Sequence, residues 1–362
     1  MLPHLAEINL LGTGGGYGES IVVHIGNNEW IVIDSCQDPY SKESLPLKFL
    51  KSRSVNLSNV KLIVCTHWDD DHIRGISELL NNAPNATFSF ARVNDLTKFL
   101  QLVRIDYEKL KKIASNSSTT EFNKCLEILQ KKKSIRKFAE ADKLLYTTQY
   151  KDSKIEVYSL SPSDLSSHIF DLEISTLMKE YSALNKKLIK QSPNDRSVVM
   201  LLKLGRHNVL LGADLEVSKN SELGWLHIIN KSQVIKGTEK STYFKIPHHG
   251  SENGYHEEIW SELLFEKPIA TITPWNKKEK LPKKDMLNRY NILSKELYIT
   301  SPTLVSSKPK KRDKNIDKII KQFNSSVREL KFQYGVVSSS IDISDAQSSW
   351  NTILSGTSIA HH

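Results

Sequence analysis

A short stretch between residues 66 and 75, THWDDDHIRG, concentrates side chains that can bind a metal ion or move a proton. It contains His67, Asp69, Asp71 and His72, directly after the apolar run 62–65. Carboxylates and imidazoles at the end of a buried strand are costly unless positive charge lies beside them. A helix N-terminus, where backbone N–H groups favour negative charge, explains one aspartate but not the two histidines and the other aspartates. The ligand types and their density therefore predict a metal site.

Two later stretches have the same form, an apolar strand that ends in residues of metal-ligand type. VLLGADLE places Asp214 just after a strand, and YFKIPHHGSENG places His248 and His249 after another, followed by Gly250, which leaves room for a close approach. Each is weak alone, because a strand-end aspartate usually caps a turn and a histidine pair is often exposed. Three such strand ends in one chain indicate a common metal-binding edge.

The elements that must position these residues alternate between strands and helices, which predicts an α/β fold. Helices are predicted over 72–82 and 168–190, and a hairpin is expected to turn at 205–207. The runs rich in apolar and β-branched residues predict strands at 8–11, 20–25, 30–34, 62–66, 88–93, 155–160, 197–204, 208–211, 242–246 and 269–273.

The composition changes between these blocks. Residues 96–190 carry apolar residues at helical spacing among many lysines, which predicts a mostly helical insertion, broken by one strand, within a single domain spanning 1–362. The final part, 306–362, is predicted to be a basic surface loop leading into a helix, then a Ser-rich tail from residue 338 that ends loosely. The basic tracts 104–137 and 308–321 can extend a phosphate-binding surface, but they can equally be solvated helix faces.

The whole chain has 362 residues, with 50 Lys and Arg against 41 Asp and Glu, giving a formal net charge of +9. This excess favours polyanionic partners such as nucleic acid, although it is also common in plain Lys-rich proteins. The three cysteines, Cys36, Cys65 and Cys125, form no disulfide framework, so we expect a reducing cytoplasm. No apolar run approaches the roughly 20 residues of a membrane-spanning helix, so no membrane role is expected.

Together these motifs resemble the metallo-β-lactamase superfamily. HxDxDH, the strand-end aspartate and HHGS are more closely similar to the hydrolase domain at the end of bacterial competence DNA-channel proteins. INLLGTGGGYGESIVV and EWIVIDS, ending near Asp34, resemble its opening strands, and SPNDRSVVMLL, with Asn194 and Ser197, resembles its Asn-x-x-Ser block. The same Asn and Ser are also ordinary turn formers. The resemblance covers residues 1–95 and 190–305, and its closing block, PIATITPWNKKEKLPKKDML, is the least specific part.

The resemblance implies a four-layer αβ/βα sandwich with two divalent metal ions at the strand edges between two sheets. In this pattern His67 and Asp69 hold one ion, Asp71 and His72 hold the second, and Asp214 bridges them. One of His248 and His249, with His249 favoured, completes the second site. Two ions would share a water and lower its pKa for attack on an ester.

The chain departs from the more familiar HxHxDH pattern in two ways. Asp69 takes the place of the second histidine, and the isolated histidine that usually precedes the bridging aspartate has no clear counterpart, since neither His168 nor His207 lies in a suitable place. The first metal position is therefore rich in oxygen, so Mn²⁺ and Mg²⁺ compete with Zn²⁺ there.

Several neighbours of the ligands have candidate roles. Asp70 can orient the water or a ligand histidine, or it is merely solvated, and His248, if it is not a ligand, can contact the phosphate or assist the leaving group. Asp71 is a candidate for both metal binding and catalysis. Asp34 is expected to support the metal loop from behind, and Trp68 to anchor the loop by burial rather than to stack on a base.

The predicted function is that of a metal-dependent hydrolase, most specifically a phosphodiesterase or nuclease, and it can belong to a bacterial defence system. A first alternative is a hydrolase of small molecules such as a cyclic phosphodiester, a choline-phosphate ester or a lactone, because the fold supplies the reactive water while the cleft selects the substrate. A second is a subunit that depends on a protein partner bound through residues 96–190.

Overall fold

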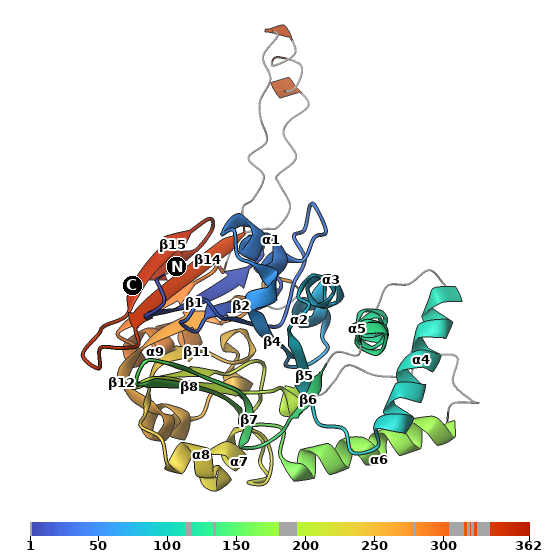
Figure 1. Cartoon of the computed structure of the whole chain (residues 1–362). Helices are drawn as coiled ribbons and strands as arrows, with labels where there is room; N and C mark the ends of the chain where they lie inside the picture. The colour runs from blue at the N-terminus through green and yellow to red at the C-terminus, as the bar shows by residue number, and fades with distance from the viewer. Residues whose placement is uncertain are drawn as a thin grey trace.

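The computed structural model describes residues 2–112, 118–132, 135–180, 194–277, 280–303 and 334–362, together with residues 315, 316, 319, 322 and 323. Within these residues, two β-sheets of eight strands each pack face to face, with helices on their outer surfaces (Figure 1). No helix in this described part of the chain combines the length and apolarity that crossing a membrane requires.

The first sheet has the strand order β15-β14-β1-β2-β3-β4-β5-β6. Its strands from β3 to β6 run parallel, and the remaining pairs are antiparallel. The bounds are β1 (Leu5–Gly12), β2 (Glu19–His24), β3 (Trp30–Ile33), β4 (Val60–Cys65), β5 (Thr87–Ala91), β6 (Arg136–Ala139), β14 (Gly335–Asp342) and β15 (Asn351–Ser355).

The second sheet has the strand order β16-β13-β12-β11-β10-β9-β8-β7. Its strands from β10 to β13 run parallel, and the others pair antiparallel with their neighbours. The bounds are β7 (Lys143–Tyr150), β8 (Ser153–Ser159), β9 (Met200–Leu204), β10 (His207–Leu211), β11 (Ser241–Lys245), β12 (Leu264–Ile272), β13 (Glu296–Ile299) and β16 (Ile359–His361).

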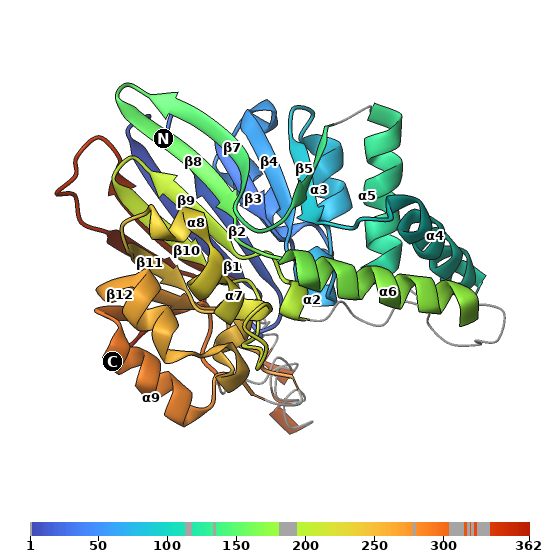
Figure 2. The ribbon, with the colours of Figure 1, turned by 90° about the horizontal axis from the view of Figure 1, so that it is seen from below.

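Helices cover both outer faces, so the molecule has four layers (Figure 2). The bounds are α1 (Leu45–Ser52), α2 (Asp70–Ile73), α3 (Ile76–Asn82), α4 (Leu96–Lys112), α5 (Ser118–Lys132), α6 (Asp164–Glu180), α7 (Gly224–Lys231), α8 (Gln233–Lys236) and α9 (Lys284–Leu293). One apolar cluster, which includes Ile8 and Val209, fills the space between the sheets, and two others lie between each sheet and its helices. This arrangement confirms the αβ/βα sandwich that the sequence predicts.

The predicted helix over 72–82 is wrong in one respect, because two short helices, α2 and α3, take its place. The chain breaks at Gly75, whose φ of 88° lies in the left-handed region. A Cβ at this position would also lie 2.9 Å from the Cα of Ser44. Only glycine meets both demands without strain, so the short helix α2, which carries Asp71 and His72, is separated from the longer helix that follows.

The segment 96–190 is less separate from the sandwich than predicted. Its helices α4, α5 and α6 do lie together at one side of the molecule (Figures 1 and 2). However, the same segment also supplies β6 to the first sheet and β7 and β8 to the second, where one strand was predicted. The lysines and exposed side chains of β6 and β7 hide these edge strands from a search for apolar runs.

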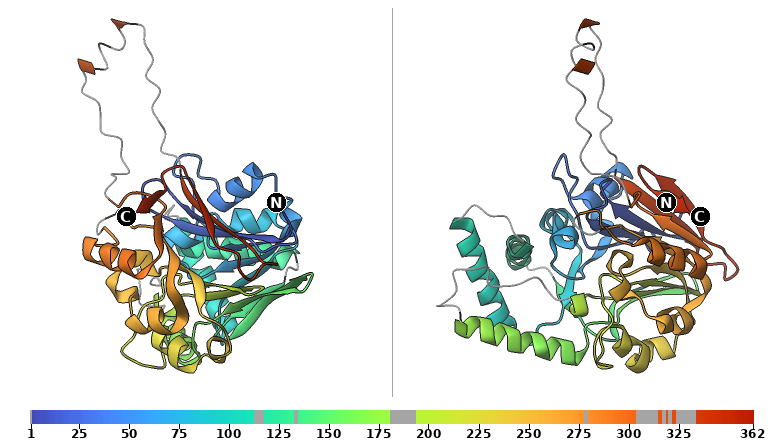
Figure 3. Two further views of the ribbon diagram at one scale, coloured as in Figure 1. Left: turned by 90° about the vertical axis from the view of Figure 1, so that its left-hand side faces the viewer. Right: turned by 180° about the vertical axis from the view of Figure 1, so that it is seen from behind.

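The prediction of a loose tail after residue 338 is wrong. β14 pairs with β1 along eight residues, and Figure 3 shows these red C-terminal strands beside the blue N-terminal strand. Serines in β14 fit the sheet because their hydroxyls find partners. Ser338 Oγ donates to Asn9 Oδ1 at 2.6 Å, and Ser339 Oγ lies 2.9 Å from Thr352 Oγ1. The predicted basic helix over 306–322 lies almost wholly outside the described residues.

Candidate metal centre

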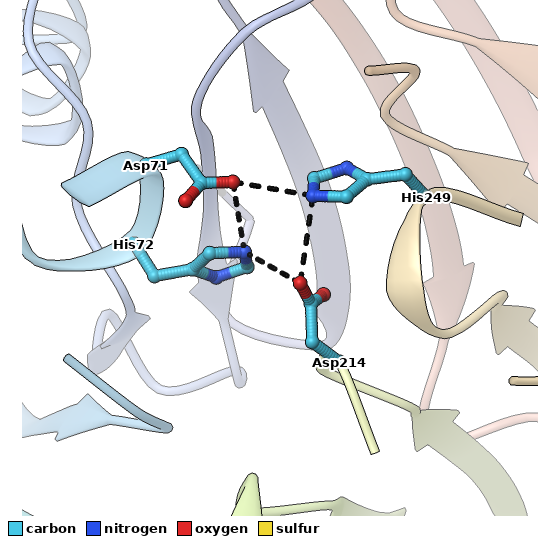
Figure 4. Close-up of side chains that lie close together, drawn as sticks. All are labelled: Asp71, His72, Asp214 and His249. Atoms are coloured by element: carbon cyan, nitrogen blue, oxygen red, sulfur yellow. Dashed lines mark hydrogen bonds and ion pairs between the residues drawn. The ribbon is translucent and has the colours of Figure 1, made fainter. Parts of the chain in front are cut away.

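Four of the predicted ligands meet at one edge of the sandwich, where parallel strands of both sheets end. Asp71 and His72 lie on α2, Asp214 follows β10, and His249 lies in the turn after β11 (Figure 4). One ligand atom from each lies within 4.8 Å of the other three, and all four residues are buried. His249 Nε2 is 3.2 Å from Asp71 Oδ2 and 3.4 Å from Asp214 Oδ2, and His72 Nε2 is 3.4 Å from the same Asp214 oxygen.

The two remaining predicted ligands adjoin this cluster. His67 Nε2 lies 3.9 Å from Asp69 Oδ2 and 3.8 Å from Asp214 Oδ2. Asp214 Oδ2 therefore faces the imidazoles of His67, His72 and His249. This is the shared position that the sequence comparison assigns to a bridging carboxylate.

A chain of hydrogen bonds behind the cluster orients the imidazoles. Asp34 accepts from Thr66 N at 2.7 Å and from Thr66 Oγ1 at 2.6 Å, and His72 Nδ1 lies 2.8 Å from Asp34 Oδ2. Because the Thr66 hydroxyl donates to Asp34, it can accept from His67 Nδ1, 2.9 Å away. His249 Nδ1 donates to the Thr273 carbonyl at 2.9 Å. A neutral imidazole in each of these settings carries its proton on Nδ1 and turns the Nε2 lone pair toward the cluster.

The backbone at this edge is unusual in the turns that carry the ligands. Ala213, His248 and His249 all have positive φ, of 44°, 47° and 53°. His248 N donates to the Ala213 carbonyl at 2.9 Å, which joins the two ligand-bearing turns. Left-handed backbone at residues other than glycine costs free energy and is found where the surroundings enforce it, often at functional sites.

The buried polar atoms of the cluster fit divalent cations. Among the described residues, four of these atoms lack a hydrogen-bond partner, namely His67 Nε2, His72 Nε2, Asp69 Oδ1 and Asp214 Oδ1. Buried polar atoms are rarely left without a partner. Imidazole nitrogens and carboxylate oxygens that converge on the same space are the donor set of Zn²⁺, Mn²⁺ and related ions, so the residues fit a metal centre.

The pKa values of the clustered side chains also indicate that positive charge stabilises this group of carboxylates. Burial by itself lowers the pKa of His72, but the carboxylates of Asp214 and Asp71 outweigh it and raise that pKa well above its ordinary value. Burial likewise opposes ionisation of Asp214, yet His72 and His249 hold its pKa well below the usual range. Burial, together with the neighbouring Asp71, raises the pKa of Asp69 to about 7. A metal ion entering this cluster would displace protons, so its binding is expected to depend on pH.

A buried ion pair joins the two sheets beneath the cluster. Lys245, in β11, places its Nζ 2.5 Å from Oε1 of Glu19, in β2. The same Nζ donates to the Ala213 carbonyl at 3.0 Å and lies 3.9 Å from Asp214 Oδ1. The pairing of Lys245 with Glu19 was not predicted from the sequence, although a lysine directly before IPHHGS, in an otherwise apolar strand, is a visible signal.

Two predicted catalytic residues lie apart from the cluster. Asp70 is about half exposed, and its Oδ1 pairs with Arg74 Nη2 at 2.9 Å. His248 turns away from the cluster, where its Nδ1 lies 2.9 Å from Asn253 Oδ1 and its Nε2 lies 3.1 Å from Asn194 Nδ2. The structure therefore places His249 in the cluster and His248 at its rim.

The remaining candidates have structural surroundings. Trp68 is buried and packs against three aromatic rings, those of Phe99 in α4, Phe122 in α5 and Phe170 in α6. Trp68 anchors the loop that carries His67 and Asp69 to the helices, and its ring is not open to a base. Gly250 makes its close approach to Pro282, since a Cβ would lie 3.0 Å from that ring. Ser197 is buried, and its carbonyl accepts a hydrogen bond from Ser161 Oγ at 2.6 Å.

Comparisons with known proteins agree with this geometry. Residues 13–96 match the family described as the metallo-beta-lactamase superfamily. The two sheets and their helices have the sandwich fold of that superfamily, whose members are metallo-hydrolases that typically bind two metal ions. A search of curated proteins gives no match.

Several solved structures are similar to this chain at low sequence identity. One is YhfI from Bacillus subtilis, a metallo-beta-lactamase fold protein, with 12% identity over 82% of this chain and 95% of that one and a TM-score of 0.40. Another is the short form of human tRNase Z, with 9% identity over 79% and 88% of the two chains and a TM-score of 0.35. A third is AidC, a dizinc quorum-quenching lactonase, with 14% identity over 54% and 55% and a TM-score of 0.30. The closer resemblance to competence DNA-channel hydrolase domains stays a prediction from the motifs.

Proposed function

We propose that this protein is a hydrolase with two divalent metal ions at the edge between its sheets. Asp71, His72 and His249 would hold one ion, His67 and Asp69 the other, and Asp214 both. The observation that carries this proposal is the convergence of three imidazole Nε2 atoms on one buried carboxylate oxygen, Asp214 Oδ2, at 3.4 to 3.8 Å.

When bound, such a pair of ions lowers the pKa of a water and supplies a nucleophile near neutral pH. The residues around the centre keep the ligands in place. Asp34 and Thr66 hold two imidazoles from behind, and the Thr273 carbonyl holds the third. Lys245 fixes the turn that carries Asp214.

The substrate class that we favour is a phosphodiester. The formal net charge of +9 suits an anionic substrate, and Asp69 gives the first metal position the oxygen-rich character that admits Mn²⁺ or Mg²⁺ as well as Zn²⁺. Asp70 and His248 would act at the rim on the substrate, with His248 assisting the leaving group. The most specific form of the proposal is a cytoplasmic nuclease of a bacterial defence system, with a protein partner bound to the helices of 96–190. This form rests on the sequence alone.

A second candidate function is the hydrolysis of a small-molecule ester or lactone. It is favoured by the size of the cavity that opens beside Asp71, about 550 Å³, which is typical of sites for small ligands. The two candidates differ in the substrate and not in the metal centre.

The deciding experiment combines metal analysis with turnover. The purified protein should contain close to two equivalents of divalent metal, and it should hydrolyse bis-p-nitrophenyl phosphate in a panel of Mn²⁺, Mg²⁺ and Zn²⁺. Asp71→Ala and Asp214→Ala should lose metal and activity while retaining the fold by circular dichroism. Asp164→Ala, at a side chain that is 95% exposed on α6, is the matched control and should match the wild type.

The outcomes separate the candidates. Cleavage of single-stranded or double-stranded DNA would support a nuclease, and cleavage of the small ester alone would favour the second candidate. Full activity with bound metal in both aspartate variants would refute the assignment of the centre.

A further inference from the structure

The cavity beside Asp71 has walls from four separate parts of the chain. They are the Gly-rich turn after β1, the loop after β3, the start of α2 and the segment after β12. Asp71 belongs both to the metal cluster and to the lining of the cavity. A molecule bound in this cavity would therefore extend directly to the proposed metal centre.

The positive charges of the cavity are not all neutralised by its carboxylates. Of the acidic side chains that line it, Asp38 is paired with Lys48 at 2.7 Å, and Asp70 is paired with Arg74. Among the described residues, no carboxylate lies within ion-pair distance of the ammonium group of Lys277, which also lines the cavity. Lys277 thus faces the cavity without a direct ion pair in the described part of the chain, and the carboxylates of Asp71 and Asp70 act on it only from a longer distance.

Aromatic rings hold Lys277 in place instead. Its Nζ lies 3.2 Å from the ring centroid of Tyr17 and 5.3 Å from that of Trp275. The Trp275 ring lies in turn 5.4 Å from the ring of His249, so Trp275 contacts both the cation and the candidate metal cluster. A cation over aromatic faces is attracted by them, which orients the ammonium group of Lys277.

The segment that carries Lys277 is fastened on both sides. Trp275 and Leu281 exchange two backbone hydrogen bonds, of 2.9 and 2.8 Å, and Asn276 N donates to the Gly16 carbonyl at 2.7 Å. Gly16 has a φ of 66°, in the left-handed region that favours glycine, and a Cβ there would lie 2.2 Å from Asn276 Nδ2, so that this side chain would have to shift. The backbone next to Lys277 is consequently held by the fold, and its exposed side chain contacts the rings of Tyr17 and Trp275.

We propose that this cavity is the binding site for a phosphodiester that carries a nucleoside-sized group, with Lys277 as the residue that selects an anionic substrate. The phosphate would lie between Lys277 and the metal centre, and the attached group would lie against the ring of Tyr17 and the turn that contains it. The cavity volume of about 550 Å³ accommodates one such group. This inference rests on the proposed function, which it deepens by naming the substrate class.

The test compares a charged ligand with its neutral counterpart. Binding of thymidine monophosphate and of thymidine to the Mn²⁺-loaded protein is measured by calorimetry for the wild type, Lys277→Ala and Lys280→Ala. Lys280 is the matched control, because it is an exposed lysine three residues further along the same segment. Loss of a charge-assisted contact should weaken binding of the nucleotide to Lys277→Ala by about tenfold or more, with binding of thymidine unchanged. Lys280→Ala should stay within about twofold of the wild type.

Steady-state kinetics with p-nitrophenyl thymidine phosphate provide the second measurement. Lys277→Ala should raise KM by a similar factor with a smaller effect on kcat, because the lysine binds the phosphate and is not a metal ligand. Equal affinities and KM values in Lys277→Ala and Lys280→Ala, or no binding of the nucleotide to the wild type, would overturn the inference. If the wild type hydrolyses phosphodiesters and Lys277→Ala behaves like its control, the role of Lys277 in substrate binding is refuted, while the proposed hydrolase function is retained. If no ester is hydrolysed but the nucleotide binds through Lys277, the cavity is retained as a nucleotide-binding site, while the proposed phosphodiesterase activity is refuted.

Discussion

Replacing Lys245 by methionine should destabilise the protein more than the loss of its apolar contacts explains. Lys245 is fully buried, and its partner Glu19 is 1% exposed, so the variant leaves a carboxylate without a cation between the two sheets. Removing one member of a buried ion pair typically costs about 3–5 kcal/mol, because the remaining charge keeps its desolvation penalty. Methionine fills nearly the same volume, so a cavity contributes little to this cost.

The assay is equilibrium unfolding of the metal-free protein in guanidinium chloride, followed by both circular dichroism and tryptophan fluorescence. If the transitions followed by the two probes coincide, unfolding is two-state and a free energy of unfolding can be calculated. Lys245→Met should lower the free energy of unfolding by about 3–5 kcal/mol, and the double variant Lys245→Met/Glu19→Met should recover most of it, because it removes both charges. Glu19→Gln should cost less than Lys245→Met, since the ammonium group keeps the Ala213 carbonyl and Asp214 as neighbours.

Metal affinity provides an independent readout of the role of Lys245. In the double variant the stability returns, but the Ala213 carbonyl has lost its donor and Asp214 its nearby cation. Metal binding should therefore stay weaker by about tenfold, within the range known for residues that orient metal ligands. The reasoning would be refuted if Lys245→Met unfolded within about 1 kcal/mol of the wild type, or if the double variant were as unstable as the single one.

Three further predictions concern other parts of the molecule. His249→Ala should lower metal affinity by at least about a hundredfold, whereas His248→Ala should leave the metal content unchanged, and equal losses in both would contradict the placement of the two rings. Burial lowers the pKa of His24 from 6.5 to about 4, so the unfolded chain takes up a proton as the pH falls below 6.5 while the folded protein does not. This difference in pKa should lower the free energy of unfolding by about 2 kcal/mol when the pH falls from 7 to 5. Denaturant titrations of the wild type and of His24→Phe at both pH values measure this effect, because the variant lacks the titrating group. Phe122→Ala should lower the free energy of unfolding by about 3–5 kcal/mol and should weaken metal binding, because the Phe122 ring packs against Trp68, which lies between His67 and Asp69 in the chain. Unchanged metal affinity at reduced stability would show that the loop does not need this anchor.

The candidate ligands could be picked out along the sequence because each motif is local, and the structure brings these residues together at one edge. His67, Asp69, Asp71 and His72 lie in one loop after β4, and Asp214 and His249 follow two other strands, so apolar runs ending in ligand-type residues are visible along the chain. The carboxyl ends of neighbouring parallel strands lie at one edge of a sheet, which makes such motifs converge. The α/β class was evident for the same reason, since buried parallel strands read as continuous apolar runs.

Other parts of the fold could not be found in this way. Edge strands such as β7 carry exposed polar side chains, and β14 is rich in serine, so neither has the pattern of a buried strand. Their pairing depends on partners far away in the chain, as with β14 and β1. Such non-local contacts determine a strand without leaving a local signal.

The sequence by itself determined the donor set, the strand ends that carry it and the class of fold, because these depend on residue types and on short-range periodicity. Only the tertiary structure places His249 in the cluster and His248 at its rim, because this placement depends on positive φ at both residues and on the Thr273 carbonyl after another strand. It also revealed that Lys245 and Glu19 meet across the two sheets and that Lys277 faces a cavity beside Asp71. These contacts join residues that are far apart in the chain, and their energies depend on burial, which residue types alone do not specify.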